Sequence, residues 1–209
     1  WRGQLFTQLD YADIAAWRVW LPFPEAIEFN HGTGALRMWL KVDGTVVEGL
    51  TADVRLQNVK TRLAQELPEL NLIRLQGRVG WKKITNSTDE GVELSTRGLS
   101  ISIHGEQALQ PLDFSLQTFP AHDGRSGSGK LNVNALELET LMNLAEYLPI
   151  HAPLRKRLDE LSPTGEIRDI RAEWNGEWPA PAHFGVKGRF VNLGMKKFDQ
   201  IPAFSGLSG

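Results

Sequence analysis

"GALRMWLKVDGTVVEGLTADVRLQNV", residues 34–59, alternates apolar and polar side chains over most of its length. In its first half one set of alternate positions is apolar: Leu36, Met38, Leu40 and Val42. Arg37 and Lys41 occupy the other set. Because successive side chains of a β-strand point to opposite faces, this pattern predicts a half-buried strand, and Asp43-Gly44 predicts a turn into a second one.

The same alternation continues along the chain and predicts strands throughout residues 34–119. Turn residues such as Arg97-Gly98 separate the segments. The sequence therefore predicts a long antiparallel meander of about ten strands, mainly β with short helices. The apolar face of such a sheet can be hidden in a barrel, in a sandwich or in an open, curved trough, and the pattern alone favours the first two because a trough leaves apolar surface uncovered.

Helical spacing of apolar residues occurs in two places, over residues 10–20 and over residues 137–161. The second region is expected to hold two helices, the later one at Pro153–Leu161. These apolar stripes indicate packing faces that cap or close a sheet.

An internal repeat organises the chain. "LDYADIAAWRVWLP" from Leu9 aligns on "LELETLMNLAEYLP" from Leu136, and the segment that begins at Gly34 aligns on "GEIRDIRAEWNG" from Gly165. "RLQNV" at Arg55 then matches "RFVNL" later in the chain, in the same order. We interpret the sequence as modules of about 130 residues: residues 1–130 hold the end of one module and most of the next, and 131–209 the start of the following one, with strands over 165–209. Since the chain starts with Trp1 rather than Met, we expect it to be part of a longer protein.

Composition bounds the function. The 41% hydrophobic and 23% charged residues are ordinary for a folded protein, and a formal net charge of −2 without a basic run argues against nucleic acid as a partner. The chain has no cysteine, which excludes disulfides, and no run of 18 apolar residues that would predict a membrane span.

One motif, "GRSGSGKL" at residues 124–131, resembles a phosphate-binding loop. Leu131 stands where that loop needs Ser or Thr, and the following residues alternate as a strand does rather than starting a helix. We expect Lys130 to be a turn or strand residue. The five histidines are isolated from one another, so we expect no metal site. We also expect no cofactor and no catalytic residue, and the chain is not expected to be an enzyme.

The run "LNVNALELETLMNLAEYLP…LSPTGEIRDIRAEWNG…HFGVKGRFVNLGM…IPAFSGLSG", from Leu131 to Gly209, resembles the repeated periplasmic region of YhdP-type, AsmA-like proteins of Gram-negative bacteria. The resemblance implies a strongly curved antiparallel sheet that forms an apolar groove, in the shape of a taco. It also implies intermembrane phospholipid transport in the periplasm, by a protein anchored in the inner membrane. The partners would be phospholipid acyl chains, adjacent modules of the same chain, and the inner and outer membranes at the ends of the full protein.

The alternative is a structural or scaffolding envelope protein with closed β-modules that binds protein partners. For the transport interpretation, the alternation predicts the groove lining. These residues are Leu36, Met38, Leu40, Val42, Leu50, Ala52, Val54, Leu56, Ile73, Leu75, Val79, Trp81, Leu99, Ile101, Ile103, Leu112, Phe114 and Leu116.

Overall fold

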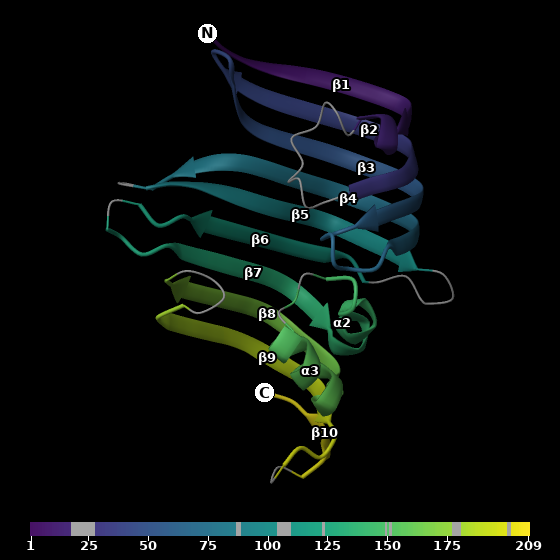
Figure 1. Ribbon diagram of the computed structural model, residues 1–209, viewed down its shortest axis with the longest axis vertical. Helices are drawn as coiled ribbons and strands as arrows, with labels where there is room; N and C mark the ends of the chain where they lie inside the picture. The colour runs from purple at the N-terminus through teal and green to yellow at the C-terminus, as the bar shows by residue number, and fades with distance from the viewer. Residues whose placement is uncertain are drawn as a thin grey trace.

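A computed structural model describes residues 1–17, 28–86, 89–103, 110–122, 124–148, 150, 152–176, 181–199 and 202–209. Within these residues, ten strands form one sheet in which every strand pairs antiparallel with its neighbour in sequence (Figure 1). The strands are β1 (Arg2–Asp13), β2 (Glu28–Asp43), β3 (Val46–Arg62), β4 (Leu70–Thr85), β5 (Glu90–Ile103), β6 (Leu112–Phe119), β7 (Ser128–Glu137), β8 (Thr164–Asn175), β9 (His183–Met195) and β10 (Phe204–Leu207). The predicted fold class is confirmed, and the described strands form an open sheet rather than a barrel or a sandwich.

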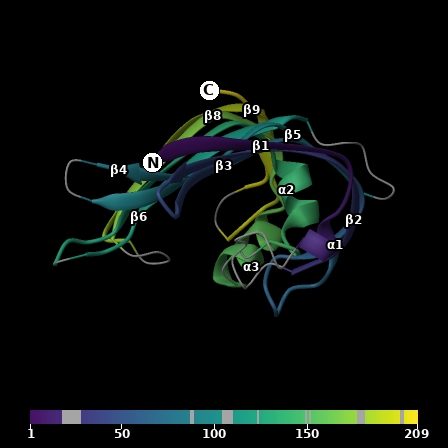
Figure 2. The ribbon, with the colours of Figure 1, turned by 90° about the horizontal axis from the view of Figure 1, so that it is seen from above.

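In the described part of the chain, three helices interrupt the meander: α1 (Ile14–Trp17), α2 (Leu138–Leu144) and α3 (Ala152–Leu161). Figure 2 shows them inside the curve of the sheet, so they lie on its concave side. α1 follows β1, and α2 and α3 connect β7 to β8. The two helical regions expected from the sequence are thus both present.

The helix expected over residues 10–20 begins later than predicted. Residues 10–13 complete β1, and the side chain of Asp13 accepts a hydrogen bond of 3.0 Å from the backbone N–H of Ala15. This is the geometry of an N-cap, which starts the helix after Asp13 instead of before it. Residues 18–20 lie outside the described residues.

Bulges bend the sheet. The pairing register shifts between Lys41 and Val42 in β2, between Gln76 and Arg78 in β4, and between Thr96 and Leu99 in β5. An extra residue on one strand of an antiparallel pair bends that strand and increases its twist. The curvature in Figure 2 follows from such shifts along the meander.

Equivalent backbone positions support the two-copy interpretation. Asn58 and Asn192, which align in the sequence repeat, both have left-handed backbones with φ of 52° and 53°. Gly34 and Gly165, also aligned, both have positive φ. The expected division after residue 130 falls inside β7, which pairs with both β6 and β8, so the sheet is continuous there.

Gly34 is a position where only glycine fits. Its φ is 154°, and a Cβ at this position would overlap the backbone carbonyl oxygen of Arg55 on β3. We expect Gly34→Ala to lower the free energy of unfolding by about 2–4 kcal/mol, because backbone atoms of two paired strands would have to separate. Urea unfolding measures this effect. Gly185→Ala is the control, since a Cβ there meets nothing within 4 Å, and equal stability of the two variants would contradict the strand geometry.

Candidate functional site

Strand pairing places apolar residues of nine successive strands in one line. Residues that pair directly across an antiparallel ladder lie on the same face. We define the long row as the line that these pairs form on β1–β9: Leu5, Leu40, Leu50, Trp81, Leu94, Leu116, Leu131, Ala172 and Val186. With about 4.8 Å between neighbouring strands, it spans roughly 38 Å.

The predicted lining residues share the face of the long row, with one exception. On β2–β4, Leu36 pairs with Val54, Met38 with Ala52, and Leu56 with Leu75. On β4–β6, Leu75 pairs with Ile101, Leu72 with Ile103, and Leu99 with Leu112. Phe114 aligns with Val79 through Thr96. The remaining member, Val42, lies in the same alternation.

Ile73 is the exception. It is 44% exposed, whereas the preceding residue, Leu72, is 5% exposed and belongs to the core. The left-handed backbone of Asn58 on β3 breaks the alternation between Leu56 and Val59, both buried, and Ile73 lies opposite this break. Since an asparagine tolerates this conformation, the strand reverses its faces without losing its pairing.

The apolar face is concave and partly closed by helical residues. Ile14 of α1 and Leu144 of α2 join a buried cluster that contains Val54, Leu56 and Val59 of β3. Tyr147 and Leu148, which follow α2, pack against this cluster. We call this part of the concave face the closed half.

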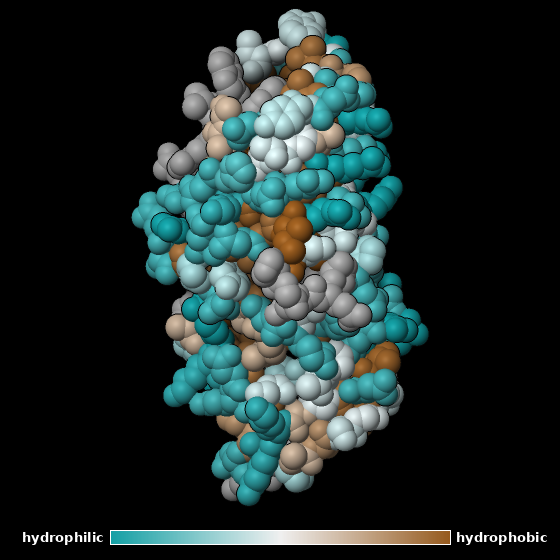
Figure 3. All heavy atoms as spheres, turned by 90° about the vertical axis from the view of Figure 1, so that its right-hand side faces the viewer, coloured by the Kyte–Doolittle hydropathy of each residue, from teal (hydrophilic) through white to brown (hydrophobic). Residues whose placement is uncertain are grey.

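Seen from the right-hand side of Figure 1, the surface is mostly hydrophilic with small separate hydrophobic patches (Figure 3).

The rest of the concave face, which carries the long row, is the open half. Leu5 is 57% exposed, Leu94 41% and Val186 54%. Half-buried residues such as Leu40 and Leu116 lie between them in the row. Ala172, the row's member on β8, is buried. Exposed apolar residues along one line of a sheet face are a feature that marks binding surfaces in folded proteins.

The convex face is charged. Arg37 pairs with Asp53, and Asp53 pairs with Arg78, so opposite charges alternate across β2–β4. Arg78 donates two hydrogen bonds of 2.5 and 2.8 Å to the carboxylate of Asp53. These bonds hold the pKa of Asp53 below its ordinary value. The guanidinium of Arg78 also lies 5.5 Å from the ring centroid of Trp39.

Lys130, the lysine of the motif that resembles a phosphate loop, lies in β7, as predicted. Its Nζ lies 3.1 Å from Oε1 of Glu173 on the neighbouring strand. The preceding Gly129 leaves room for Trp174, whose ring occupies the space that a Cβ would need. The motif therefore serves strand packing.

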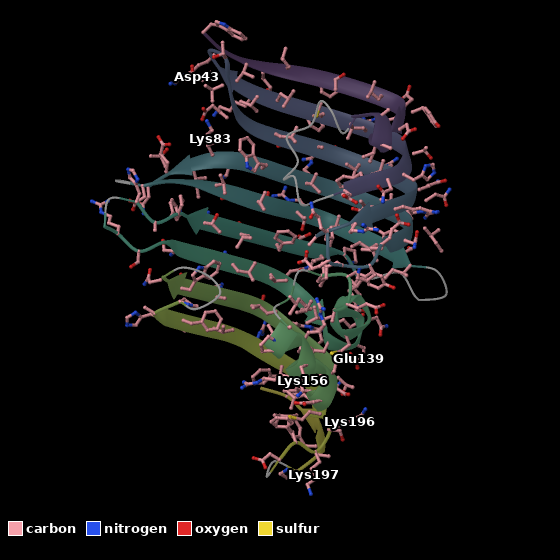
Figure 4. The ribbon with its side chains drawn as sticks, viewed as in Figure 1. Asp43, Lys83, Glu139, Lys156, Lys196 and Lys197 are labelled. Atoms are coloured by element: carbon pink, nitrogen blue, oxygen red, sulfur yellow. The ribbon has the colours of Figure 1, made fainter. Side chains whose placement is uncertain are left out.

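A hollow of about 720 Å³ lies where the strands of the open half end. Its lining combines the polar residues Glu48, Lys83, Thr85 and Glu90 with Trp174 and with apolar residues such as Val92 and Phe119. Figure 4 shows Lys83 and Asp43 at this end of the sheet, and Glu139 and Lys156 among the helices at the other end.

Sequence analysis did not assign several residues of the concave face: Leu5, Val59, Leu72, Leu94, Leu131, Ala172, Trp174 and Val186. The alternation in "LNVNALE" would have identified Leu131. The glycine-rich β9 carries a weaker pattern of alternation, and Val186 is placed by its pairing with Ala172.

Among the described residues, no group of three or more His, Cys, Asp or Glu could hold a metal ion. No helix in the described part of the chain is long and apolar enough to span a membrane.

We expect a charged substitution to destabilise the closed half more than the open half. Val54, in the closed half, is 8% exposed, whereas Leu94, in the open half, is 41% exposed. We expect Val54→Asp to lower the free energy of unfolding by about 3 kcal/mol or more, because it buries an unpaired carboxylate, and Leu94→Asp by less than about 1 kcal/mol. Chemical unfolding of both variants tests this expectation. Equal losses of unfolding free energy in the two variants would mean that the helices do not separate a closed half from an open half.

The chain was compared with protein families, curated proteins and solved structures. The family model described as YhdP protein matches residues 1–209. No curated protein and no solved structure matched the chain.

Proposed function

The chain belongs to the YhdP family, and on this premise we propose that the open half of its concave face holds phospholipid acyl chains during transport between the inner and outer membranes. The observation that carries the proposal is the long row, an apolar line across nine paired strands that is exposed at Leu5, Leu94 and Val186. Acyl chains would cover this line, with a gain of roughly 25 cal/mol for each Å² of apolar surface removed from water.

The length of the long row suits movement as well as binding. One acyl chain spans about half of the 30 Å hydrocarbon thickness of a bilayer, or about 15 Å, and the row of roughly 38 Å is more than twice as long. Neighbouring positions such as Leu94, Leu116 and Leu131 present similar hydrocarbon surfaces. A lipid that moves by one strand therefore exchanges one apolar contact for another, so the barrier to movement along the row is low.

The protein would act in the periplasm as part of a chain anchored in the inner membrane. Exposed apolar residues of the concave face occur near both edges of the sheet, with Leu5 on the edge strand β1, and Phe184 and Val186 on β9, the neighbour of the edge strand β10. An exposed edge strand readily pairs with another strand. Adjacent modules of the same chain would cover these edges and extend the row toward each membrane.

Photo-crosslinking tests contact with lipid. Leu116 lies on the concave face, and its neighbour Ser115 pairs with Ser95 and Asn132 on the convex face. We expect a photoreactive amino acid at Leu116 to form lipid adducts in cells and the same residue at Ser115 to form none. Adducts at Ser115 alone would show that the faces are assigned backwards. Protein adducts at Leu116 would favour a scaffolding protein whose apolar face is covered by a partner.

A charge in the long row should remove lipid without unfolding the chain. We expect Leu94→Asp to retain about tenfold less co-purifying lipid than the wild type, since a carboxylate beside an acyl chain costs more than the 1.4 kcal/mol that corresponds to a factor of ten. Mass spectrometry of extracted lipid measures the change. Ser95→Asp, on the opposite face, is the control and should retain the wild-type amount. Equal retention by both variants would argue against the site.

A further inference from the structure

The open half changes from apolar to charged along each strand. On the concave face, β4 presents Val79, Trp81, Lys83 and Thr85 in turn, and β5 presents Leu94, Val92 and Glu90. The row next to the long row starts at Lys83 and continues through Val92, Thr118, Gly129 and Trp174. The concave face thus has an apolar interior, a row of mixed polarity and a polar end at Thr85 and Glu90, which is the order of parts in a phospholipid.

The distance along the strands matches one acyl chain. Val79 packs against the closed core, and Lys83 lies four residues further along β4. At about 3.4 Å for each residue, the separation is roughly 14 Å, close to the 15 Å or so of one bilayer leaflet's hydrocarbon. A tail that starts beside Lys83 would therefore end where the closed half begins, and its headgroup would lie in the hollow at the strand ends.

The charges in the hollow are held loosely. Nζ of Lys83 lies 3.4 Å from Oε1 of Glu48; the Lys83 side chain is exposed, at 42%, and that of Glu48 is half-buried, at 34%. An exposed ion pair of this kind contributes little to stability, so either partner can be exchanged for a group of a ligand at small cost. Glu90 lines the same hollow and supplies a second carboxylate.

We propose that this hollow binds the zwitterionic phosphoethanolamine headgroup of a phospholipid, an assignment that rests on the proposed function. Lys83 receives the phosphate, and Glu48 and Glu90 receive the primary ammonium. Trp174, whose ring lies over Gly129 at the border of the apolar face, contacts the region between headgroup and tail. With two carboxylates and one ammonium of its own, the hollow disfavours a headgroup that carries only negative charge, such as phosphoglycerol.

The test uses vesicles of phosphatidylethanolamine and phosphatidylglycerol in equal amounts, with identical acyl chains. The chain is incubated with the vesicles and re-isolated, and its bound lipid is quantified by mass spectrometry. We expect the wild type to bind about threefold more of the ethanolamine lipid, which corresponds to the strength of one exposed ion pair. The double variant Glu48→Gln with Glu90→Gln should lose this preference, and Lys83→Gln should bind several-fold less of both lipids.

Lys82 provides a matched control. It is the neighbour of Lys83 in sequence, but its side chain lies on the convex face opposite Glu93. There Nζ of Lys82 lies 3.0 Å from Oε1 of Glu93. Lys82→Gln should bind both lipids as the wild type does, and equal effects of the two lysine variants would overturn the assignment.

The outcomes separate this inference from the proposed function. Bound lipid without headgroup preference in the wild type overturns the headgroup site and leaves the proposed function standing. No bound lipid in any variant overturns both. If lipid-free protein captures soluble O-phosphoethanolamine as tightly as the lipid, the hollow is a site for polar solutes and the lipid assignment is wrong.

Discussion

The register of antiparallel pairing is the constraint on which the rest of the structure depends. Each residue of the long row lies on the concave face because its partners on both sides do, from Leu5 to Val186. A slip of one residue between two strands would turn a strand's apolar side chains to the convex face. The alternating charges of Arg37, Asp53 and Arg78 oppose such a slip, since it would place each of them opposite an apolar residue instead of an opposite charge.

The helices divide one apolar face between two purposes. In the closed half, Leu144 and Ile14 complete a core with β2–β4, and this core gives the sheet stability of its own. In the open half the same kind of side chain is left uncovered. A sheet whose whole concave face were open would need a partner for stability, whereas in this arrangement the core of the closed half stabilises the fold whether or not the open half is covered.

The sequence predicted the parts of the fold that depend on local pattern. The strict alternation from Leu36 to Leu56 assigned the faces of β2 and β3, because two-residue periodicity has few other interpretations. It failed at Ile73, since the left-handed backbone of Asn58 reverses the faces and is not encoded by hydrophobicity. It also started α1 too early, although Asp13 is a good N-cap residue. The division into two halves was not predictable from pattern, because it depends on Leu144 meeting strands more than 80 residues earlier in the chain, such as Val54.

The strictly consecutive strand order bears on how the chain folds. Every strand from β2 to β9 needs only its immediate neighbours in sequence, so no strand waits for a partner from a distant part of the chain. Folds with such short sequence separations between paired segments form quickly, because little loop entropy is lost before each pairing is made. The sheet can therefore grow hairpin by hairpin as the polypeptide emerges from a ribosome or a translocation pore, with each completed strand serving as the template for the next.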